Sequence, residues 1–167
     1  MAKKKDEKTN VMRILDQKKI PYTANFYEGA DPSNTSTYGV HVAETLGREP
    51  DRVLKTLVAR SASGGIYVFE VPVAESLDLK KAARSVGEKN VELLPVKDIT
   101  AVTGYIRGGC SPVGMKKEYP TVFHETVQLY ETVHISGGKI GVDVEIGTED
   151  LRELVQGSYA DIIKGER

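Results

Sequence analysis

The segments "VLKTLVAR" and "IYVFEVPV", residues 53–60 and 66–73, constrain the fold more than any other feature of this sequence. Both are rich in β-branched residues, and the "SASGG" between them contains two glycines suited to a turn. The two segments are therefore predicted to be strands joined by a Gly-containing turn. The domain is accordingly expected to contain a β-sheet.

Further strands and helices are predicted on both sides of this pair. Strands are expected at residues 22–27, 91–94, 121–123, 129–135 and 142–146. Helices are expected behind a cap at Thr9 or Asn10, around 41–46, from an Asp78 cap to Val86, ending at Thr103, and from a Thr148 cap to about Val155. Strands outnumber helices and lie partly in hairpins and partly between helices. This order favours an α/β domain with a mixed β-sheet or barrel and surrounding helices.

Two of these expected strands show a period of two. In "LYETVHI", residues 129–135, one set of alternate residues is Leu129, Glu131, Val133 and Ile135, and the other is Tyr130, Thr132 and His134. In "VDVEI", residues 142–146, the valines and the isoleucine point to one face and the two acidic residues to the other.

Length and composition bound the class of protein. The 167 residues suit a single domain, 1–167, with the lysine-rich residues 1–8 as a flexible tail. No apolar run approaches about 18 residues and no apolar signal segment opens the chain, so a cytoplasmic protein without membrane partners is expected. The single cysteine agrees with a reducing compartment. A formal net charge of -1 predicts that any direct contact with nucleic acid is local and weak.

Two glycine-rich stretches, "GGCSPVG" (108–114) and "SGGKIG" (136–141), are candidate binding loops. Backbone N–H groups in such loops can converge on an anion or an oxyanion, although glycine also serves plain turns. Gly109 and Gly114 have the spacing of a phosphate loop. Met115 and Lys116 then stand where that loop requires Lys and Ser or Thr, which excludes a nucleoside triphosphate site.

Lys55 and Cys110 are the candidate chemical groups. Lys55 lies among apolar neighbours, so its charge is either compensated by a ligand or turned to water at a sheet edge. With Arg107, Lys116 and Lys117 it suggests a pocket for an anionic ligand, or else a solvated basic rim. Cys110 is either a nucleophile beside one of the three histidines or a small apolar filler. No spacing of His, Cys and carboxylate residues suggests a metal site, and no cofactor is expected.

Several motifs, in their order along the chain, resemble the YbaK/EbsC group of aminoacyl-tRNA deacylases, relatives of the editing domain inserted in bacterial prolyl-tRNA synthetases. The motifs are "TNVMRILDQKKIPY", "KTLV", "LDLKKAA", "TGYIRGGCSPVGMKK", "PTV", "ISGGK" and "VDVEI", and the resemblance covers about residues 9–163. It implies a free-standing trans-editing enzyme that removes cysteine from misacylated Cys-tRNA(Pro). It also implies a mixed β-barrel with helices around it, which agrees with the pattern above.

The resemblance further implies the site residues. Lys55 matches the lysine most tied to activity in the family and is the expected catalytic residue. The expected substrate-binding residues are Tyr27, Tyr105, Gly108, Gly109, Ser111, Pro112, Gly114, Ser136, Gly137 and Gly138. Cys110 occupies the variable position of the family's GGxSP motif and has no implied role. In the family, the thiol of the cysteinyl group is thought to attack its own ester carbonyl, so the enzyme supplies no nucleophile.

The near-neutral net charge, taken with this resemblance, also bears on the partners. Weak direct binding of tRNA(Pro) is expected, with prolyl-tRNA synthetase as the partner that supplies tRNA specificity. The alternatives are an Ala-tRNA(Pro)-type deacylase, a non-catalytic nucleotide- or aminoacyl-binding module, and a cysteine-dependent hydrolase. Ile140 stands where many relatives carry an arginine, which removes a phosphate or structural contact. Small apolar differences between aminoacyl groups give discrimination of only about 10 to 200-fold, so the sequence leaves the amino acid open.

Overall fold

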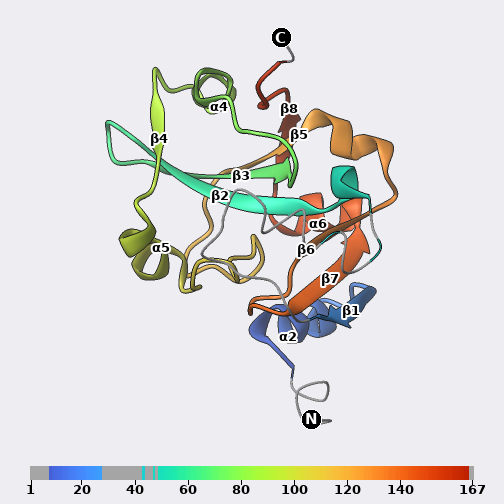
Figure 1. The fold of residues 1–167 in the computed structure, drawn as a ribbon. Coiled ribbons are helices and arrows are strands. Elements are labelled where there is room, and N and C mark those ends of the chain that lie inside the picture. Colours follow the sequence, from blue (N-terminus) through green and yellow to red (C-terminus); the bar gives the residue numbers. More distant parts are fainter. Residues whose placement is uncertain (1–7, 28–42, 44–46, 48, 166–167) are drawn as a thin grey trace.

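The computed structural model describes residues 8–27, 43, 47 and 49–165, with strands in two sheets and helices around them (Figure 1). The smaller sheet is antiparallel, in the order β1 (Tyr22–Phe26), β7 (Val142–Gly147) and β6 (Thr132–Ser136). The larger has the order β4 (Val91–Leu93), β2 (Leu54–Ser61), β3 (Ile66–Pro72), β5 (Thr121–His124) and β8 (Ser158–Ala160). In the larger sheet β4, β2 and β3 are antiparallel neighbours, whereas β5 and β8 continue parallel to β3.

The described helices are short. They are α2 (Asn10–Gln17), α4 (Leu79–Ser85), α5 (Val96–Thr103) and α6 (Thr148–Leu154), with 3₁₀ turns η1 (Pro50–Arg52) and η2 (Glu125–Leu129). Thr9 caps α2 by accepting from the Met12 N–H at 3.2 Å, and Asp78 caps α4 by accepting from the Lys81 N–H at 3.0 Å. Both caps agree with the sequence, since Thr and Asp side chains satisfy the first free amides of a helix. No described helix is long and apolar enough to cross a membrane.

Two apolar clusters hold these elements together. One lies against the smaller sheet and α2 and includes Val11, Leu15 and Phe123. The other packs α4 on the larger sheet and includes Phe69 and Ala82. The sheets meet at a bridge between Val53 and His134, so the described strands form two joined sheets. The predicted mixed α/β architecture is confirmed in this two-sheet form.

The structure corrects several local expectations. Leu129 belongs to η2 and is 80% exposed, because the strand begins only at Thr132. The cap of α6 is Gly147, while Thr148 is its first residue and donates its hydroxyl to the Tyr130 carbonyl at 2.6 Å. β8 has no counterpart in the predicted elements, since three residues with two polar side chains carry no strand pattern.

Some predictions lie outside the described residues. These are most of the helix expected around 41–46 and residues 1–7 of the expected tail. Lys8, the last residue of that tail, forms an ion pair with Asp16 of α2.

Candidate active site

A cavity of about 300 Å³ lies where strand β2 loses its partner on one side. β2 pairs with β4 only at residues 59–61, and the bridge to β6 lies at Val53. Between these points no described strand pairs with that side of β2. The ends of the diverging strands, Leu93 of β4 and Ser136 of β6, line the gap together with Lys55.

The cavity walls are mostly apolar. They consist of Val53, Leu54, Leu57, Val58, Val73, Leu93, Leu94, Val96, Ile99, Ile135 and Val142. Six side chains add polar or charged groups, namely Tyr27, Lys55, Thr56, Arg107, Ser136 and Asp143. A small apolar chamber with a few convergent polar groups is the usual form of a site for a small organic group.

Lys55 is one of two cations that line this chamber, the other being Arg107. It is half-buried, and no described carboxylate forms an ion pair with it. Burial lowers the pKa of its ammonium, and the negative charge of Glu75 partly opposes this effect. Of the two readings that the sequence left open for Lys55, the structure therefore favours a charge available to a ligand over an edge lysine turned to water.

Asp143 is a site residue that the sequence did not reveal. It is 3% exposed and lines the cavity. His134 Nδ1 lies 2.7 Å from Asp143 Oδ2, so the ring N–H donates to the carboxylate, and Asn25 Nδ2 donates to the same oxygen at 3.2 Å. These donors fix the carboxylate on one side of the chamber. Alternation had placed Asp143 on a polar strand face, but both faces of β7 are covered here.

His134 completes this buried pair. It is fully buried, and its Nε2 has no hydrogen-bond partner among the described residues, with the nearest carboxylate oxygen, Glu145 Oε1, at 3.8 Å. The sequence did contain a signal for the His134–Asp143 pair, because a histidine lies in one predicted strand and acidic residues lie in the next. The register that brings them together is a property of the folded sheet.

The two glycine-rich loops contact each other. A Cβ on Gly109 would lie 3.2 Å from the Lys139 Cα and 3.3 Å from the Ile140 backbone nitrogen, which is closer than ordinary contact. Gly109 thus lets the backbones of the two loops approach. Gly108 from the first loop and Ser136 from the second line the cavity at this junction.

The other predicted binding residues divide into two groups. Tyr27 lines the cavity, as do Lys55, Gly108 and Ser136. The rest are not part of the lining: Tyr105, Gly109, Ser111, Pro112, Gly114, Gly137 and Gly138. The Tyr105 hydroxyl donates to the Val113 carbonyl, and the fully buried Ser111 hydroxyl accepts from the Val113 N–H at 3.3 Å.

Cys110 lines the cavity, but its environment disfavours a thiolate. Burial, with a further contribution from the nearby Glu70 carboxyl, raises the pKa of its thiol to about 12. Neither His124 nor His134 hydrogen-bonds to it, and His41 lies outside the described residues. A buried neutral thiol is a poor nucleophile.

Of the basic residues in and beside the first loop, only some line the cavity. Arg107 lines the cavity, whereas Lys116 donates to the Ala101 carbonyl at 3.2 Å and, like Lys117, is not part of the lining. Across the described ranges, no group of three or more His, Cys, Asp and Glu side chains is arranged to hold a metal ion.

Comparison with known proteins identifies the family of this fold and cavity. The profile of the family described as the aminoacyl-tRNA editing domain matches residues 32–154. The chain belongs to this family. A relative from Enterococcus faecalis, provisionally named a Cys-tRNA(Pro)/Cys-tRNA(Cys) deacylase, EbsC, is 46% identical over 99% of this chain and 100% of its own length. The predicted family and enzyme class, an aminoacyl-tRNA deacylase, are confirmed.

Solved structures share the fold of this editing domain. A hypothetical protein named APE2540 has a TM-score of 0.82 at 20% identity, covering 93% of this chain and 100% of its own. A protein described as a candidate trans-editing enzyme for prolyl-tRNA synthetase has a TM-score of 0.77 at 23% identity, covering 95% and 100%. At these identities the likeness concerns the fold.

Proposed function

We propose that this protein is a trans-editing enzyme that hydrolyses the ester of Cys-tRNA(Pro). The observation that carries the proposal is the half-buried Lys55, which has no described ion-pair partner and lines an apolar cavity of about 300 Å³. The name of the 46% identical relative supports the cysteinyl substrate. The fold shared with a candidate trans-editing enzyme for prolyl-tRNA synthetase agrees with an activity in trans.

Two charged groups of the cavity and its apolar walls have roles in this proposal. The Lys55 ammonium stabilises the negative charge that develops on the ester carbonyl oxygen as it is attacked. The Asp143 carboxylate, held by His134 and Asn25, binds the α-ammonium group of the amino acid. The apolar walls hold the short side chain and exclude water from the reacting atoms until the ester is cleaved.

The reaction proceeds through the substrate's own thiol. The cysteinyl sulfur, having lost its proton, forms a bond to the ester carbonyl carbon, and the bond from that carbon to the ribose oxygen breaks. The ribose oxygen takes up a proton and tRNA leaves, while the four-membered thiolactone is opened by water to give free cysteine. No side chain of the protein needs to act as nucleophile, which agrees with the raised pKa of Cys110.

Prolyl-tRNA synthetase is the proposed partner. A chain with a formal net charge of -1 has little general attraction for tRNA. The synthetase, which binds tRNA(Pro), would therefore supply the specificity for the nucleic acid. The editing protein would supply the specificity for the amino acid.

The test compares four esters on the same tRNA(Pro): cysteinyl, seryl, alanyl and prolyl. We expect rapid loss of the cysteinyl ester only, because the seryl hydroxyl is a far weaker acid than the thiol at neutral pH and the other two side chains have no nucleophile. The measurement is the initial rate of deacylation, with and without prolyl-tRNA synthetase. Equal rates for the cysteinyl and alanyl esters would replace the proposal with an Ala-tRNA(Pro)-type or broad deacylase. No hydrolysis of any ester would indicate a binding module.

A further inference from the structure

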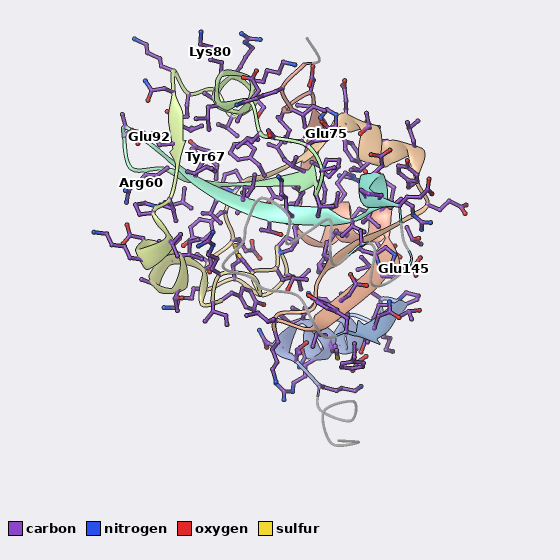
Figure 2. The ribbon with its side chains drawn as sticks, in the orientation of Figure 1. Arg60, Tyr67, Glu75, Lys80, Glu92 and Glu145 are labelled. Atoms are coloured by element: carbon purple, nitrogen blue, oxygen red, sulfur yellow. The ribbon has the colours of Figure 1, made fainter. Side chains whose placement is uncertain are left out.

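A surface groove of about 610 Å³ adjoins the cavity. The two share Lys55, Leu57 and Leu93 in their linings, so the groove is continuous with the cavity at Lys55. Its lining also includes Leu79 and Lys80 at the start of α4, and Lys164 near the end of the described chain. Figure 2 shows Lys80 at the surface of α4.

The groove carries positive charge. Its lining contains Lys55, Lys80 and Lys164 and a single acidic residue, Asp78. Asp78 is already engaged, because its carboxylate accepts the amide of Lys81 as the cap of α4. This local excess of cations lies on a chain whose formal net charge is -1. A groove lined by three lysines on a nearly neutral protein is a favourable site for a polyanion.

The groove also offers apolar surface. Leu79 is 41% exposed and Leu93 is 47% exposed, and both line it. Exposed aliphatic side chains close to lysines suit a ligand that has both charged and apolar parts. A single-stranded nucleic acid has this chemistry, with phosphates for the lysines and bases for the leucines.

We propose that this groove holds the single-stranded 3′ end of the tRNA, with its phosphates on Lys80 and Lys164, while the cavity takes the aminoacyl group. The proposal rests on the proposed function. A cavity of about 300 Å³ is at the small end of ligand sites, so it accommodates the amino acid while the nucleotides lie outside it. Lys55, at the junction, then faces the ester between the two parts.

The test uses Lys80→Ala/Lys164→Ala and two substrates, cysteinyl-adenosine and a Cys-tRNA(Pro) acceptor minihelix. The nucleoside ester lacks the phosphates, so its kcat/KM should change less than about twofold, whereas kcat/KM for the minihelix should fall about tenfold through KM. The slope of log kcat/KM against log salt concentration should become shallower by about 1.4, for two contacts to a single strand. Lys18→Ala/Lys89→Ala removes the same charge from exposed positions outside the groove and should behave like wild type.

The outcomes separate this inference from the proposed function. If kcat/KM falls equally on both substrates, or on neither, the groove does not bind the 3′ end. The proposed deacylase activity would still stand. If wild type hydrolyses neither ester, the proposed function fails. Binding of a minihelix that carries no amino acid then tests whether the groove binds the 3′ end. Weaker binding by the Lys80/Lys164 variant than by the control would support it, and equal binding would overturn it.

Discussion

Glu70 lies fully buried next to the lining of the cavity. The Thr56 hydroxyl donates to Glu70 Oε1 at 3.1 Å, while Oε2 has no partner among the described residues. Burial raises the pKa of this carboxyl well above its ordinary value of 4.5, and the Thr56 hydrogen bond opposes the shift only partly. Glu70 therefore keeps its proton in the folded state at pH values where the unfolded chain has lost it.

Glu70→Gln should stabilise the protein increasingly as the pH rises. The unfolded carboxyl ionises above about pH 4.5, so the wild type loses about 1.4 kcal/mol of unfolding free energy per pH unit from there to the raised pKa. The neutral amide removes this dependence. Urea unfolding between pH 5 and about pH 7 measures the difference in unfolding free energy between Glu70→Gln and wild type. Glu92→Gln, at an exposed position of β4, is the control (Figure 2). A stability difference that does not change with pH would contradict the assignment.

Asp143→Asn tests the proposed recognition of the amino group. The amide can still accept from His134, so the fold should be kept, but the charge that binds the α-ammonium is lost. We expect KM for the cysteinyl ester to rise about 10 to 100-fold with a smaller change in kcat, since a hydrogen bond to a charged group contributes about 1.5 to 3 kcal/mol. Asn25→Ala, which removes a donor but no charge, is the control. An unchanged KM would remove Asp143 from the binding site.

Single residues were predictable from the sequence to different degrees. Lys55 was identified because a charged residue in an apolar strand is unusual, and it does line the cavity. Asp143 was missed because strand alternation indicates a polar face but not whether another layer covers it. The glycines were identified as a group, but only the folded chain shows which of them border the cavity and which support its loops.

At the scale of elements, the first glycine-rich loop is held by close packing on α2. Gly114 has φ +81°, and a Cβ there would lie 2.8 Å from the Tyr105 hydroxyl and 2.9 Å from both Asn10 Nδ2 and Ile14 Cδ1. The loop that borders the cavity is thus fixed from behind by the first helix.

Gly114→Ala should destabilise the protein more than Gly64→Ala. Both glycines have positive φ, so both substitutions strain the backbone, but a Cβ on Gly64 would meet no atom within 4 Å. The overpacking at Gly114 should add about 1 to 3 kcal/mol. Chemical denaturation of the two variants isolates that difference. Equal destabilisation would mean that the loop can move away from α2 without loss.

Elements with strong local signals were predicted well. Helices α2 and α4 have the expected caps, and the β2–β3 hairpin has the expected turn. The failures were η2 and β8, which are short and lack a periodic pattern. β8 is held by pairing with β5, a contact between residues 122–124 and 158–160 that local sequence does not encode.

At the scale of the whole molecule, β2 belongs to the larger sheet, and Val53, just before it, bridges to β6 of the smaller sheet. It pairs with β4 at one end and meets β6 at the other, and the cavity lies between them. Residues from β2, β4, β6, β7, α5 and the first glycine-rich loop line it, together with Tyr27 just after β1. This convergence depends on tertiary packing, so the sequence indicated a mixed α/β fold and a lysine site but not the shape of the chamber.

The most direct test is the initial rate of Cys-tRNA(Pro) deacylation by wild type, Lys55→Ala and Cys110→Ala under identical conditions. We expect Lys55→Ala to lose about 100-fold or more, the effect of removing one group that stabilises a developing oxyanion. Cys110→Ala should stay within about threefold of wild type, because a thiol with a pKa of about 12 does not act as the nucleophile. Full activity in Lys55→Ala, or loss of activity in Cys110→Ala, would contradict the account.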